Sequence, residues 1–218
     1  MEILLFKWLY GAVRPMLFYL AIKIALFGKI SFIVGSQMAF FSASSVLHPL
    51  GGCFLGASGL CLSFGSIFLV RLFLGMSPHL LLIHCLPGFC AALYVARPSC
   101  TIRLLLPLGC MILFMIHPVG WQAAPYALYW LIPIIISFVN NKSFFVQALG
   151  ATFVAHAVGS VGWLYCVPMT ASSWWVLIPI VAIERFTFAA GAFLIYQVAK
   201  YSKSVWEMVF VRSINIVD

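Results

Sequence analysis

Acidic residues are almost missing from this chain: Glu2, Glu184, Glu207 and Asp218 are the complete set among 218 residues. Charged residues of all kinds make up only 7% of the sequence, whereas soluble domains carry about 25%. Hydrophobic residues make up 65%, and the mean hydropathy is +1.14. A water-soluble fold of this length could not bury so much apolar surface. The composition therefore excludes a soluble domain and predicts an all-α, polytopic transmembrane helical bundle embedded in the lipid bilayer.

The motifs of common enzymes and metal sites are also missing. The seven cysteines form no Cys-x-x-Cys pair, and the sequence contains no H-E-x-x-H, G-x-S-x-G or P-loop pattern. We therefore expect no metal, no cofactor, no catalytic residues and no ATPase of its own. The cysteines are interpreted as small apolar side chains within the apolar runs.

The net charge of +8 does not indicate a nucleic-acid partner, because basic residues of membrane proteins collect in cytoplasmic connections. Three basic connections are separated by two crossings each, and they contain Arg97 and Arg103, then Lys142, then Lys200, Lys203 and Arg212. This pattern predicts that all three lie on the cytoplasmic face, with the C-terminus inside. A bacterial-type inner (plasma) membrane is expected.

A membrane span needs about 20 apolar residues. The candidate segments are 30–48, 51–74, 79–96, 104–120, 123–139, 144–166 and 174–199. Residues 1–28 form an N-terminal amphipathic or first membrane segment, residues 29–200 the bundle, and residues 201–218 a cytoplasmic tail. Six spans satisfy the charge rule best, and seven or eight remain alternatives.

Small residues recur at helical spacing on two early segments, as expected where helices touch in lipid. Segment 51–74 carries Gly52, Gly56, Gly59 and Ser63, and segment 30–48 carries Gly35, Ala39 and Ala43. Packing within the protein and docking to a partner subunit both explain such stripes.

The stretch GSQMAFFSASS, residues 35–45, contains the second of these stripes. It resembles the small-x-x-x-small pattern on the first helix of the substrate-binding S components of energy-coupling-factor vitamin transporters. The resemblance implies docking to a transmembrane coupling subunit, ATPase partner subunits, and a compact six-helix protein with a basic cytoplasmic face.

Polar residues interrupt the last two apolar segments. Thr152, His156 and Ser160 form one stripe on segment 144–166, and Glu184 and Arg185 lie well inside segment 174–199. Charged groups at that depth are costly and usually have interior partners. We expect His156, Glu184 and Arg185 to converge, with Glu184 and Arg185 finding partners on other helices rather than each other. Two hypotheses remain for these residues: they lock two helices together, or they form a site for a solute or a proton.

The segment MIHPVGWQAAPYALYWLIP, residues 115–133, joins two short apolar runs through an aromatic-rich turn. It is either an outer hairpin with an aromatic belt or the mouth of a solute pocket. In the second case the candidate binding residues are His117, Gln122, Tyr126 and Trp130.

These features favour a small-solute transporter, or a substrate-binding membrane subunit that depends on coupling or ATPase subunits for energy. A structural or assembly subunit of a membrane complex is the alternative. An intramembrane enzyme acting on a lipid or quinone is a third hypothesis, since one intramembrane glutamate and scattered histidines provide few catalytic groups.

Overall fold

The computed structural model describes residues 20–24, 29–32, 39–42, 44–97, 99–140 and 142–214. The larger helices are α2 (Ser44–Phe73), α3 (Pro78–Ala96), α4 (Leu106–Ile116), α6 (Leu131–Phe138), α7 (Phe144–Cys166) and α8 (Ala171–Ile214). Shorter pieces are the π-helix η1 (Thr101–Leu105), helix α5 (Pro118–Gln122) and the 3-10 helix η2 (Ala124–Trp130). Strands β1 (Lys29–Phe32) and β2 (Ala39–Ser42) form one antiparallel pair. The described part is otherwise helical, as the composition predicts.

Three described helices are long and apolar enough to cross a membrane: Ser44–Phe73, Phe144–Cys166 and the Ala171–Ser202 part of α8. Shorter apolar helical stretches cover Ile83–Ala96, Thr101–Ile116 and Ala124–Phe138. Large apolar side chains are also exposed on the outside, with Phe73 at 89% and Phe138 at 74% exposure. Such a surface suits contact with lipid, and the described helices fit association with a membrane.

The expected helix over 30–48 is wrong, because this region contains strands β1 and β2 before α2 begins at Ser44. Isoleucine and phenylalanine in the two strands favour extended backbone. Ala39 lies in β2, so it has no helical spacing to a partner, while Gly35 and Ala43 fall outside the described residues. The N-terminal segment of residues 1–28 also falls there, apart from the helical residues 20–24.

Helix α2 runs through Pro49, where the sequence suggests a break, and is kinked at Gly56. Gly56 has φ of 64°, a conformation that glycine adopts without strain. Gly52 lies against α3: a β-carbon placed there would lie 2.8 Å from Val95 Cβ and 3.0 Å from the Ala96 nitrogen. The first part of the small-residue stripe therefore packs within the chain. Gly59 and Ser63 are buried further along the same helix.

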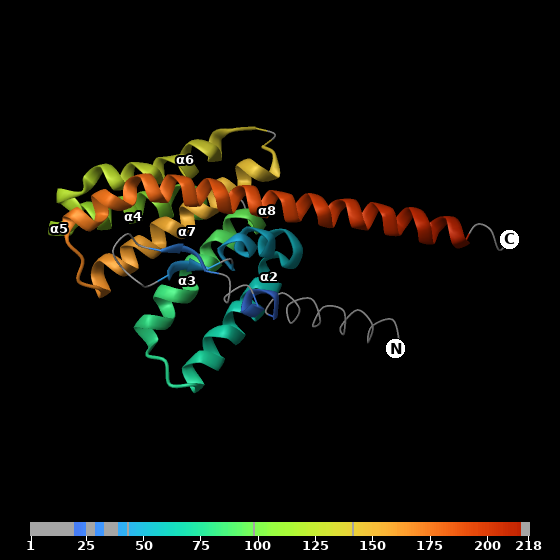
Figure 1. Cartoon of the computed structure of the whole chain (residues 1–218), viewed down its shortest axis with the longest axis horizontal. Helices are drawn as coiled ribbons and strands as arrows, with labels where there is room; N and C mark the ends of the chain where they lie inside the picture. The colour runs from blue at the N-terminus through green and yellow to red at the C-terminus, as the bar shows by residue number, and fades with distance from the viewer. Residues whose placement is uncertain are drawn as a thin grey trace.

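Helix α7 lies at the centre of the bundle, with α3 and α8 packed along it (Figure 1). Its glycines let α3 approach closely. A β-carbon at Gly162 would lie 3.3 Å from Ile83, and one at Gly150 would collide with the Tyr94 ring. The Tyr94 hydroxyl in turn donates to the Pro133 carbonyl at 3.0 Å, which ties α3 to α6. This contact network holds the polar stripe of α7 in the interior.

Helix α8 is longer than the sequence suggests, since it continues from the bundle to Ile214 and projects beyond the other helices (Figure 1). The predicted tail boundary at residue 201 therefore does not coincide with the end of the helix. A helix of 44 residues is about 66 Å long, roughly twice the thickness of a bilayer core.

Two predicted cytoplasmic basic residues cap helix ends. Lys142 Nζ donates to the carbonyls of Ile136 at 2.7 Å and Ser137 at 3.1 Å, at the end of α6. The Arg103 guanidinium donates to the Tyr94 carbonyl, near the end of α3, at 3.3 Å. Burial, and then the positive charge of Arg103, lowers the pKa of Lys142. Arg103 and Lys142 therefore lie at the same end of the bundle.

Replacing Lys142 by methionine should destabilise the protein by about 1–2 kcal/mol, because the last carbonyls of α6 lose a charged donor. Thermal unfolding of the purified protein in detergent measures the change. Lys200→Met is the matched control, since Lys200 is exposed. Equal melting temperatures for both variants would contradict the capping role.

Candidate functional site

The polar stripe of α7 is buried: Thr152, His156 and Ser160 are 2%, 3% and 6% exposed. Thr152 Oγ1 donates to the Leu149 carbonyl at 2.9 Å, and also lies 3.4 Å from the Arg185 carbonyl of α8. Ser160 Oγ shares a hydrogen bond of 3.2 Å with the Tyr126 hydroxyl of η2. The stripe therefore faces α8 at one end and η2 at the other.

Glu184 and Arg185 are also buried, at 7% and 2% exposure. They form an ion pair with each other, in which Arg185 Nη2 donates to Glu184 Oε2 at 3.3 Å. The expectation that neighbouring residues would find partners only on other helices was wrong, because the long arginine side chain turns back along its own helix. The guanidinium also lies 4.9 Å from the Phe188 ring centre, at the distance of a cation–π contact.

His156 lies among aromatic rings rather than against the carboxylate of Glu184. Its ring centre is 5.2 Å from that of Tyr126 and 6.4 Å from that of Trp130. Arg185 is near enough to act on the imidazole through its charge. His156 and Arg185 are both buried, and no hydrogen bond joins His156 to the ion pair among the described residues.

Aromatic side chains from three elements, α4, η2 and α8, continue this region. Trp174, near the start of α8, lies 4.9 Å from Tyr126 and 5.1 Å from Phe114 of α4, measured between ring centres. Phe114 also contacts Trp130 at 5.3 Å. Tyr126 and Trp130 were predicted as binding residues, and both lie here, fully buried. We call the following eight residues the central cluster: Tyr126, Trp130, Thr152, His156, Ser160, Trp174, Glu184 and Arg185.

Several polar atoms of the central cluster have no hydrogen-bond partner among the described residues. They are the indole nitrogens of Trp130 and Trp174, both imidazole nitrogens of His156, and Oε1 of Glu184. Together they offer two fixed donors, a carboxylate acceptor and an imidazole that can do both. The region can therefore hydrogen-bond a small molecule with both donor and acceptor groups. Among the described residues, no group of three metal-ligating side chains occurs.

His48 of α2 packs against α3 and was not among the predicted site residues. It packs against Gly88 of α3, where a β-carbon would lie 2.7 Å from the imidazole. Its ring centre is 6.1 Å from that of Phe64, and Arg185 is near enough to act on it through its charge. In the sequence, His48 is a histidine beside small residues in an apolar run. Only the position of α2 in the fold shows that its side chain packs against α3.

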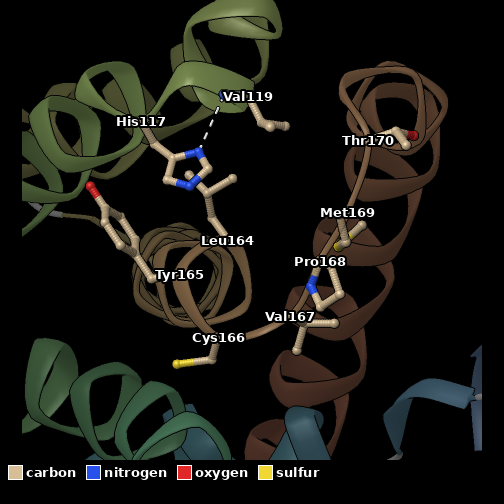
Figure 2. Close-up of a pocket in the computed structure, with 9 residues that line it drawn as sticks. All are labelled: His117, Val119, Leu164, Tyr165, Cys166, Val167, Pro168, Met169 and Thr170. Atoms are coloured by element: carbon tan, nitrogen blue, oxygen red, sulfur yellow. Dashed lines mark hydrogen bonds between the residues drawn. The ribbon is translucent and has the colours of Figure 1, made fainter.

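His117 and Gln122 lie apart from the central cluster. Gln122 is exposed and donates to the Pro118 carbonyl of its own turn at 3.3 Å. His117 accepts a hydrogen bond from the Val119 backbone at 3.3 Å and lines a separate pocket of about 510 Å³ (Figure 2). The rest of that pocket is formed by Val119 and by residues 164–170, where α7 ends and α8 begins.

Comparison of the chain with protein-family models, with curated proteins and with solved structures found no match.

Proposed function

We propose that this protein is a membrane subunit that binds a small polar solute in the central cluster, as a transporter or as the substrate-binding part of one. The observation that supports this is a set of buried polar atoms on Trp130, His156, Trp174 and Glu184 that have no hydrogen-bond partner among the described residues. A buried hydrogen-bonding atom without a partner costs about 1–3 kcal/mol. Native proteins contain few such atoms, and they seldom gather in one place.

The cluster also has the composition of a ligand site. Small-molecule sites are mostly apolar and aromatic, with a few polar groups that fix the orientation of the ligand. Here the rings of Tyr126 and Trp130 contact the imidazole of His156, and the Phe114 ring packs against both of them. The nearby Glu184–Arg185 pair adds charged groups of both signs. We infer a solute that is small and carries both hydrogen-bond donors and acceptors.

The proposal includes a topology. Six crossings would use the three long helices and the three shorter apolar stretches that end at Ala96, Ile116 and Phe138. Arg103 and Lys142 would face the cytoplasm, as would the end of α8. The pocket beside His117 would then open on the opposite side. Labelling of engineered cysteines next to Lys142 and Lys200 in intact cells tests this arrangement, and ready labelling from outside would contradict it.

Energy would come from partner subunits, because the sequence has no nucleotide-binding motif. Coupling and ATPase subunits of the kind used by energy-coupling-factor transporters fit this requirement. Co-purification of the protein with an ATPase module from its native membrane would support the proposal.

A structural or assembly subunit is the second candidate, and the Glu184–Arg185 ion pair favours it. The pair neutralises itself within α8, while Thr152 Oγ1 lies 3.4 Å from the Arg185 carbonyl and links α7 to the same turn. Such contacts would lock two helices without any solute.

Replacing His156 by phenylalanine separates the two functions. The change keeps an aromatic ring between Tyr126 and Trp130, and it removes two buried nitrogens that have no partner among the described residues. Under the proposal, the variant should lose bound solute while its melting temperature without solute stays the same or rises. Mass spectrometry of small molecules extracted from the purified protein is the measurement.

His84→Phe is the matched control, because His84 is exposed on α3. It should retain the solute found in the wild-type protein. The solute-binding proposal would be wrong if wild-type protein from its native membrane carries no small molecule while His156→Phe lowers the melting temperature.

A further inference from the structure

We infer that the pocket beside His117 is the entrance through which solute reaches the central cluster, and that the Leu164 side chain closes it. This inference rests on the proposed function, since it assigns an access route to that same site. The structural observation behind it does not depend on the proposed function: residues of the pocket and of the central cluster lie on one face of α7.

That face can be followed along the helix in steps of four residues. Leu164 lines the pocket, Ser160 lies one turn deeper, and His156 lies one turn deeper again. Residues four apart share a helix face, and eight residues correspond to about 12 Å along the axis. Leu164 of the pocket and His156 of the central cluster therefore lie on the same face of α7, two helical turns apart.

Leu164 lies between the pocket and Ser160 along this face of α7. Leu164 is only 5% exposed although it lines the pocket. It packs close to Gly120, where a β-carbon would lie 3.2 Å from Leu164 Cδ2 and would collide with the Phe114 carbonyl. On the inner side, the Phe114 ring stacks on Tyr126 at 5.5 Å. One turn deeper on α7, Ser160 shares a hydrogen bond of 3.2 Å with the Tyr126 hydroxyl.

The walls of the pocket suit an entrance for a polar molecule. Figure 2 shows His117 and Leu164 on one side of the pocket, with Pro168, Met169 and Thr170 on the other. His117 Nδ1 already accepts the Val119 backbone hydrogen, which leaves Nε2 for an incoming solute. The opposite wall is the short connection of residues 167–170 between α7 and α8, which is not helical. Loops of this kind are common places for opening motions.

The test measures access to Ser160 without needing to know the solute. Ser160→Cys is made in a cysteine-free background, and its reaction with a small charged methanethiosulfonate reagent is followed in purified protein. Leu164→Ala should raise the rate of this reaction by roughly tenfold or more, because it removes the side chain that lies between the pocket and Ser160. Leu128→Ala is the matched control, since Leu128 is 57% exposed on η2 and lies outside the pocket lining.

A second probe separates an opened path from a loosened protein. Ala148→Cys is also buried on α7, at the end away from the pocket, and Ala148 is 0% exposed in the wild-type structure. Its reaction rate should not change with Leu164→Ala. Equal acceleration at positions 148 and 160, or equal effects of Leu164→Ala and Leu128→Ala, would overturn the inference. If the labelling result holds but no solute is ever recovered, the proposed function fails while the path remains.

Discussion

Replacing Arg185 by leucine should destabilise the protein by about 3–5 kcal/mol, the usual cost of removing one partner of a buried ion pair. The guanidinium is 2% exposed and donates to Glu184 at 3.3 Å. Without it, the Glu184 carboxyl would remain buried among apolar side chains with no opposite charge. Thermal and denaturant unfolding in detergent, compared with wild-type protein, measures this loss.

The double variant Glu184→Leu/Arg185→Leu is the control, because it removes both charges together. Its unfolding free energy should lie within about 1–2 kcal/mol of the wild-type value, since apolar replacement of a whole buried pair is often neutral. A solute site would still be damaged, so bound solute should be lost from a double variant that folds normally. A double variant as unstable as Arg185→Leu would show that the two charges have other essential partners.

Replacing Gly52 by leucine should separate α2 from α3 and destabilise the protein by about 3 kcal/mol or more. A β-carbon at this position would collide with the Ala92 carbonyl, and it would lie 3.0 Å from the Ala96 nitrogen. Both of these are backbone atoms, which cannot move aside as the end of a flexible side chain can. The expected result is a lower yield of folded protein and a lower melting temperature.

Gly65→Leu on the same helix is the matched control, because a β-carbon there would have nothing within 4 Å. This variant should keep its melting temperature close to that of the wild-type protein. Similar losses for Gly52→Leu and Gly65→Leu would contradict the prediction, because the contact with α3 would then not set the effect.

Helices α3 and α7 were predictable from sequence. The predicted segment 144–166 coincides with α7, and 79–96 differs from α3 by one residue. Both segments are long apolar runs bounded by polar residues, prolines or basic residues, so length and hydropathy are sufficient. The four-residue spacing of Thr152, His156 and Ser160 likewise predicted a shared face, because an α-helix repeats every 3.6 residues.

The N-terminal third was not predictable in the same way. An apolar run with aromatic and β-branched residues suits a strand as well as a helix, and residues 29–42 include two strands. Pro49 suggested a break, yet α2 continues through it and bends only at Gly56. The sequence shows that Pro49 has no backbone N–H to donate. Packing against the neighbouring helix decides whether α2 continues past this proline.

The sequence by itself determined that this is an apolar helical chain with its ionisable interior residues on the last two helices. Hydropathy and helical periodicity are local properties, so they can be read directly. Only the tertiary structure decided that Glu184 pairs with Arg185, that Trp174 joins Tyr126 and Trp130, and that His117 lines a different pocket. These contacts depend on helix rotation and side-chain conformation, which follow from the packing of α7 against all of its neighbours at once.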